Sequence, residues 1–335
     1  LFRSVSAYTQ LNLTSERGYI QPTGPRGGGF MKEKVRLLDI DPKSWEHPAD
    51  RAALVALKQL PGFDNVVKFV FGLTAEKSLR LLAMANAVRV SERQFPRVRR
   101  LIEDACFILD WPEKPEVFVT QSPVLNAAAS GVDKPFITIH SATVDALADD
   151  ELLAVLAHEL AHIMSGHVLY KTLLSILVNI SLGTLRIPVT YLALQGIIGA
   201  LREWDRKSEL SADRASLLAV QDENAVYSLL MKLAGGIQGE MVLEEFLVQA
   251  EEYEAGGDVL DSVHKLLNIM GQTHPFPIIR LKELKVWRDG GAYEEMLTGK
   301  YRRRGGKLDP KQELEDAVRE YREELSRSKD PLGEA

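Results

Sequence analysis

The chain has 335 residues, which is enough for one large domain or two modest ones around a buried core. Its formal net charge of -6 supplies no basic face, so we expect no nucleic-acid partner. Cys106 is the single cysteine, which excludes an internal disulfide and a cysteine-rich zinc site and favours a reducing, cytoplasmic location.

The first 30 residues are polar and rich in glycine, and they lack the continuous apolar core of a signal peptide. We interpret 1–30 as a disordered or non-native N-terminal extension. Met31 is therefore our expected native start.

Residues 31–110 have a helical pattern, because apolar side chains recur there at roughly helical spacing. The pattern then changes, and 116–120 and 135–140 are short, β-branched runs that predict two strands of a small sheet. Small residues lie between the two runs, at Asn126, Ala127, Ala128 and Ala129. They either let another backbone approach closely or form a plain surface loop, and the sequence leaves both interpretations open.

A buried helix is expected to begin near Asp149 and to continue to Met164, since apolar residues fall on nearly all of its faces. His158, Glu159 and His162 conflict with that burial, because each unpaired polar group would cost about 1–3 kcal/mol. Two histidines four residues apart on a helix lie on one face and can share a zinc ion. The conflict therefore indicates a metal site.

A catalytic zinc site needs a third protein ligand and an open fourth position. The metzincin pattern is excluded, because Ser165 and Val168 stand where that class has glycine and histidine. Cys106 lies in an apolar helical segment and is interpreted as a core residue.

Glu209 is the better candidate for the third ligand, and Asp213 follows it at helical spacing. A ligating histidine commonly donates its second ring N–H to a carboxylate, and Asp213 suits that part toward His158. The alternative is a solvated acidic pair with Arg206 as its ion-pair partner.

The stretch 150–170, the block 209–213 and the later Thr273-His274-Pro275 together resemble the gluzincin peptidases related to HtpX and the CAAX prenyl protease, peptidase family M48. The resemblance covers roughly residues 74 to 285 and implies a mainly helical α+β, zincin-like fold. It also implies the roles of seven residues: zinc ligands His158, His162 and Glu209, general base Glu159, supporting carboxylate Asp213, transition-state donor His274 and structural arginine Arg280.

This chain departs from the family pattern at Ala128, where an aromatic residue is usual, and at Ser141, where glycine is usual. We therefore expect a cleft of different shape. Membrane members have spans before the zinc helix and this chain has none there, so prenylated-peptide processing is not carried over. The remaining histidines receive no role in the site: His140, His167 and His264.

The metallopeptidase core is expected over 111–290 and contains an apolar helical hairpin at 172–201. Its two apolar stretches are shorter than the roughly 20 residues of a membrane span, so a hairpin packed on the body is favoured about two to one over one that dips into a membrane. Peripheral membrane contact stays open. A charged tail, 291–335, should close with an amphipathic helix over 309–327.

These observations predict a zinc-dependent metalloendopeptidase that holds one Zn2+ per chain. We expect it to act on peptides or unfolded proteins, extended along Asn126 to Ala129, in a role such as protein quality control. The alternatives are a latent or inactive zinc fold that binds partners, and a membrane-surface factor in which proteolysis is secondary.

Overall fold

The computed structural model describes residues 34–73, 76–179, 189–235, 240–255, 276–305 and 319. The expected extension 1–30, the block containing His274, and nearly all of the expected tail helix lie outside these residues. His264 and the middle of the apolar hairpin, 180–188, lie outside them as well.

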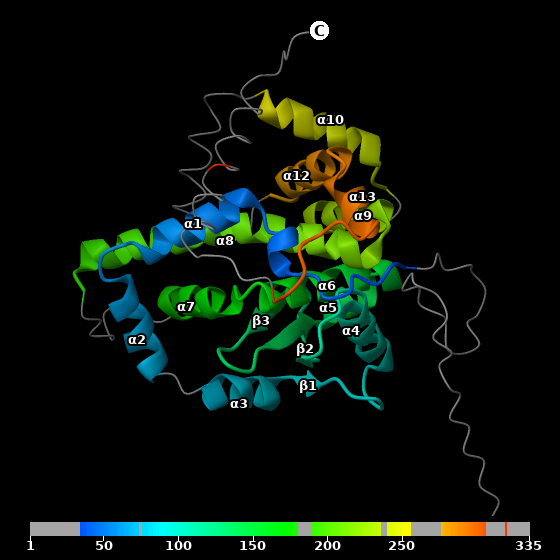
Figure 1. Ribbon diagram of the computed structural model, residues 1–335. Coiled ribbons are helices and arrows are strands. Elements are labelled where there is room, and N and C mark those ends of the chain that lie inside the picture. The colour runs from blue at the N-terminus through cyan, green and yellow to red at the C-terminus, as the bar shows by residue number, and fades with distance from the viewer. Residues whose placement is uncertain are drawn as a thin grey trace, which may run out of the picture.

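Helices make up most of the described chain, and a four-stranded sheet lies at one side of it (Figure 1). The α-helices are α1 (Pro48–Lys58), α2 (Phe63–Leu73), α3 (Glu76–Asn86), α4 (Pro96–Ile108), α5 (Ser141–Ala146), α6 (Asp149–Met164), α7 (Val168–Asn179), α8 (Tyr191–Val220), α9 (Glu223–Gly235), α10 (Leu243–Glu254), α12 (Pro277–Asp289) and α13 (Ala292–Leu297), with a short 3-10 helix η1 (Pro42–Ser44) before them. The strands are β1 (Val88–Arg89), β2 (Glu116–Thr120), β3 (Ala127–Ser130) and β4 (Phe136–His140). The α+β, mainly helical class is confirmed.

The sheet has the strand order β1-β2-β4-β3, in which β2 and β4 are parallel and the other pairs antiparallel. Both strands expected from β-branched runs are present. The segment that the sequence left open between a loop and a backbone-pairing edge is β3, an edge strand with one free side. This free side becomes important at the site.

Helix α6 forms the centre of the main core and packs against α4, α8, α9 and β3. Its first turn is acidic, and the Ala148 N–H donates to the Glu151 carboxylate at 2.8 Å, which begins the helix. Thirteen of its sixteen residues are buried, as the apolar pattern predicted. The helix therefore places His158, Glu159 and His162 in the interior of the protein.

Helix α8 is a single 30-residue helix that continues well past 201, where the expected hairpin ends. Residues 200–220 contain no proline or glycine, so nothing ends the helix near Arg202. Its first half packs with α7, α1 and α2 in a second apolar core. Its second half packs on α6 and carries Glu209 and Asp213.

The described parts of the expected hairpin pack on the body, through Leu173 and Leu177 of α7 and Leu201 of α8. Among the described residues, none of the helices taken singly has the length and apolarity to cross a membrane. Taken together, α6 and residues 168–178 of α7 do have that length and composition, but the pair is bent by 97°.

Candidate metal centre and active site

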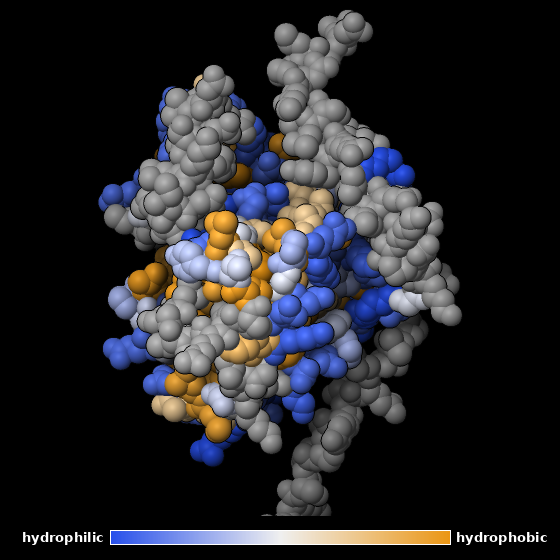
Figure 2. Space-filling model, turned by 90° about the vertical axis from the view of Figure 1, so that its left-hand side faces the viewer, coloured by the Kyte–Doolittle hydropathy of each residue, from blue (hydrophilic) through white to orange (hydrophobic). Residues whose placement is uncertain are grey.

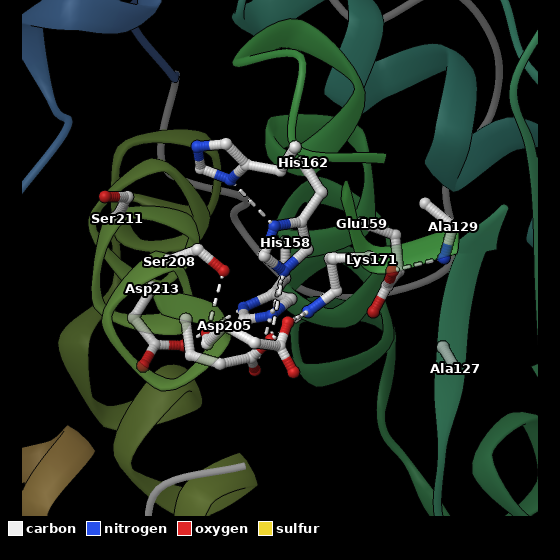
Figure 3. Close-up of polar contacts among 12 residues, drawn as sticks. Ala127, Ala129, His158, Glu159, His162, Lys171, Asp205, Ser208, Ser211 and Asp213 are labelled. Carbon is white, nitrogen blue, oxygen red and sulfur yellow. Dashed lines mark hydrogen bonds and ion pairs between the residues drawn. The ribbon is translucent and has the colours of Figure 1, made fainter. Parts of the chain in front are cut away.

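Three ligand atoms converge between α6 and α8 (Figure 3). His158 Nε2 lies 3.2 Å from His162 Nε2, and Glu209 reaches both rings at 3.2 Å, one through each carboxylate oxygen. The donors of a tetrahedral zinc site, bound at about 2.0–2.1 Å, lie about 3.3 Å apart. The spacing and the mixture of two imidazoles with one carboxylate therefore fit such a metal ion.

The three candidate ligands are buried. His158, His162 and Glu209 are 8%, 1% and 1% exposed. Burial lowers the pKa of His158, but Glu209 and Asp213 outweigh it and raise that pKa to about 9 in the metal-free protein. The alternative of a solvated acidic pair is wrong, because both carboxylates are buried and Arg206 pairs with Glu203 instead.

Asp213 and Arg280 support His158 from behind. His158 Nδ1 lies 3.1 Å from Asp213 Oδ1, which leaves Nε2 of the same ring directed at the ligand cluster. Arg280, on α12, donates to both oxygens of Asp213 at 2.6 and 2.8 Å. Burial raises the pKa of Asp213, but the guanidinium outweighs it and holds that pKa below its usual value. Asp213 is therefore an ionised acceptor for His158.

Glu159 lies one residue round from the two histidines, on the side of α6 that faces β3 (Figure 3). Its Oε2 accepts a hydrogen bond from the Ala129 N–H at 2.7 Å. Burial, with help from nearby Glu209, raises the pKa of Glu159, while His158 opposes the shift. A carboxylate with a raised pKa beside a metal site is suited to take a proton from water.

The free edge of β3 offers backbone groups to the site. Residue pairs of antiparallel strands alternate between those that exchange hydrogen bonds and those that do not. His140 N–H donates to Asn126 C=O at 3.0 Å, which fixes the alternation. Ala128 therefore pairs with β4, whereas Ala127 and Ala129 direct their N–H and C=O groups to the free edge. A strand edge of this kind is able to pair with an extended peptide.

Two cavities meet at Glu159 and Glu209, which line both. The first has a volume of about 300 Å³ and runs toward α9 and α12, where apolar residues dominate its wall: Val155, Val226, Leu229, Leu230, Leu233 and Phe276. The second has a volume of about 250 Å³ and runs toward α7. Asn126 and Ala127 also line both cavities, so the start of β3 borders each of them.

Sequence reasoning missed two buried residues at the site. His167, to which we gave no role, is 1% exposed, and its Nδ1 lies 3.0 Å from Nδ1 of His162. The missed signal was Gly166, because a glycine just past a helix end folds the next residue back onto the last turn. Lys171, on α7, donates to Glu209 at 2.7 Å and to Asp205 at 2.6 Å. It is the one charged residue of α7, and no motif around it indicated a role in the site.

The fold and the site together define a metallopeptidase with an HExxH helix. Residues 92–288 match the model of Peptidase family M48. This chain belongs to peptidase family M48 and is HtpX-like.

The relatives that the chain resembles are also named as proteases. The chain is similar to the plastoglobule-localized metallopeptidase 48, chloroplastic, of Arabidopsis thaliana, at 34% identity over 77% of this chain and 76% of the relative. It is also similar to Protease HtpX homolog 2 of Methanosarcina mazei, at 29% identity over 46% of this chain and 60% of the relative. Protease HtpX homolog 1 of Streptomyces coelicolor is 29% identical over 56% of this chain and 70% of the relative. No solved structure matches the chain.

Proposed function

We propose that the chain is a zinc-dependent endopeptidase whose zinc ligands are His158, His162 and Glu209. The observation that carries the proposal is the convergence of these three buried side chains, with Glu159 beside them and a strand edge in contact with Glu159. Family membership makes the chain a metallopeptidase, and two imidazoles with one carboxylate form a ligand set that catalytic zinc has in peptidases.

A zinc ion bound there supplies an acidified water and a Lewis acid for the substrate carbonyl. Glu159 accepts the proton of the attacking water and then protonates the departing amine. Its buried position and raised pKa make it a stronger base than an exposed carboxylate. Asp213 and Arg280 hold His158 in the tautomer that leaves Nε2 free for the metal.

His274 is proposed to donate to the oxyanion of the tetrahedral transition state. It lies outside the described residues, and the proposal rests on its motif with Pro275 and on Arg280, six residues later, which contacts Asp213. Loss of such a donor typically costs about 10²- to 10³-fold in rate. A His274→Phe variant that binds zinc and keeps full activity would refute the role.

The substrate is proposed to be a peptide or an unfolded protein that lies extended along β3. The outward backbone groups of Ala127 and Ala129 support this pairing, and the two cavities provide room for side chains on both sides of the scissile bond. Pairing through the backbone depends little on the side chains of the substrate, so we expect broad cleavage specificity. The cavity toward α9 and α12 should favour apolar substrate residues.

Peripheral membrane contact is a further part of the proposal, through the hairpin 172–201. At the described start of its second arm, Tyr191 and Leu192 are 72% and 82% exposed, and Val178 at the end of the first arm is 43% exposed. Figure 2 faces this end of the molecule and shows hydrophobic residues gathered among polar ones. Liposome flotation of the wild type and of a Leu192→Ser variant tests the contact. The proposal of membrane contact is refuted if neither protein floats at high salt. A cytoplasmic location stays a prediction from the single cysteine.

Cleavage of a quenched-fluorescent peptide library tests the proposed function. The wild type is assayed with zinc, with chelator, and beside a Glu159→Gln variant of matched zinc content. We expect chelator to abolish cleavage and the variant to lose about 10²- to 10⁴-fold in kcat. Absence of cleavage by a wild type that holds one tight zinc would instead favour a latent or inactive module, an alternative to which the relatives give no support.

A further inference from the structure

His167 is brought to His162 by the way α6 ends. Ser165 caps the helix, and Gly166 follows it with a φ of 69°, a left-handed conformation that glycine adopts without strain. The N–H groups of Gly166 and His167 then donate back to the carbonyls of Ile163 and His162, at 3.1 and 2.9 Å. This pair of bonds is the Schellman motif, and it fixes the backbone of His167 under the last helical turn.

When His162 binds a metal, the direction of the hydrogen bond between the two rings is fixed. The metal needs the lone pair of His162 Nε2, so the ring proton of His162 must lie on Nδ1. That Nδ1–H donates to His167 Nδ1 at 3.0 Å, which leaves the proton of a neutral His167 on its Nε2. His167 Nε2 lies 3.2 Å from Asp50 Oδ2, within reach of a hydrogen bond to the carboxylate.

Asp50 ends this series of hydrogen bonds and is itself held in place by two donors. It lies on α1, is 1% exposed, and accepts hydrogen bonds from Trp204 Nε1 at 2.8 Å and from Ser211 Oγ at 2.6 Å. Both donors belong to α8, the helix that also carries Glu209. The Trp204 ring also packs edge-on against His167, with 5.6 Å between the ring centroids.

We propose that His167 and Asp50 are positioning residues for the metal ligand His162, acting as a relay in which one imidazole links the ligand to a buried carboxylate. His158 meets its carboxylate, Asp213, directly, whereas His162 reaches one through a second ring. The inference rests on the proposed metal ligands. It makes α1, whose Asp50 lies 112 residues before His162 in the sequence, part of the proposed metal centre.

The test measures zinc affinity of the full chain by competition with a chromophoric chelator. Loss of a partner that orients a metal ligand typically costs about 10- to 100-fold in affinity, and we expect that loss in His167→Leu and Asp50→Asn. His167→Gln should recover most of the affinity, since its amide can accept from His162 and donate to Asp50. The visible spectrum of the Co2+-loaded proteins should shift in the two weak variants and return in the Gln variant.

Glu151→Gln is the matched control for Asp50→Asn, because it also converts a buried carboxylate to its amide. Glu151 lies on the ligand helix seven residues before His158, about 10 Å along its axis, and pairs with Lys232. We expect its zinc affinity to equal that of the wild type. Should Asp50→Asn fail to fold, the comparison of His167→Gln with His167→Leu by itself tests whether His167 positions His162.

Wild-type affinity in His167→Leu would overturn the relay, as would a His167→Gln variant no tighter than His167→Leu. A His162→Ala variant separates this failure from failure of the ligand assignment. If His162→Ala loses zinc while His167→Leu keeps it, the ligand assignment is supported and the relay is refuted. If His162→Ala also keeps full affinity, the assigned ligand set falls and the relay falls with it.

Discussion

Glu159 and Ala129 are joined by a 2.7 Å hydrogen bond, from the backbone N–H of the strand edge to the carboxylate of the proposed base. The donor is one of the outward groups that an extended substrate would use. A substrate carbonyl that takes this N–H releases the Glu159 carboxylate, which can then turn to water. If the substrate pairs with β3 as proposed, its binding and the release of the proposed base are coupled through the Ala129 N–H.

Methylation of single backbone nitrogens in a good substrate tests the pairing. An N-methyl group removes one N–H that the outward carbonyls of Ala127 and Ala129 would accept, and one such bond contributes about 0.5–1.5 kcal/mol. We expect kcat/KM to fall about 2- to 12-fold at the paired positions and to stay unchanged beyond them. Uniform tolerance of methylation along the peptide would mean that β3 does not bind the substrate backbone.

Arg280 should contribute strongly to the stability of the metal-free protein. Arg280→Met leaves the buried Asp213 carboxylate without its guanidinium, which costs about 3–5 kcal/mol in the free energy of unfolding. Arg288→Met, on the same helix, breaks a partly exposed contact with Glu223 and should cost less than about 1 kcal/mol. Urea denaturation of both variants measures the difference. Equal losses would show that Asp213 does not depend on Arg280.

The features that were predictable from the sequence are those with a local pattern. His158 and His162 share a helix face by their spacing, and the two β-branched runs identify β2 and β4. Strand β3 was left undecided because its three alanines have neither β-branching nor alternation.

The contacts that escaped prediction depend on long-range packing. Asp50 on α1 has no local feature that distinguishes it from a surface acid of the first helical turn. Lys171 meets Glu209 and Asp205 only because α7 turns back along α8. His167 was the exception, since the Gly166-His167 pair after the helix could have revealed its position.

Zinc affinity should depend on pH below about pH 9. In the metal-free protein the neighbouring carboxylates raise the pKa of His158 to about 9 against the effect of burial. Zinc needs the deprotonated ring, so each pH unit below that pKa weakens binding by about tenfold, and above it this dependence disappears. Chelator competition, corrected for the protonation of the chelator, measures the slope. A flat profile from about pH 7 to about pH 9 would contradict the proton competition.

Cys106 should be inert in the native protein. Its side chain is 3% exposed, and burial raises the pKa of the thiol to about 12. At about pH 8 the reactive thiolate is then only about 10⁻⁴ of the population. We expect no alkylation by iodoacetamide in native buffer and full alkylation in denaturant, read by mass spectrometry. Rapid native labelling would show that α4 does not pack as described.

The most direct test of the account is a zinc titration of the metal-free protein in which bound zinc and peptide cleavage are followed together. We predict that both rise in parallel and saturate at one zinc per chain, and that Glu209→Gln needs more zinc to reach the same occupancy. Full cleavage before zinc is bound, or zinc binding that is indifferent to the loss of Glu209, would contradict the account.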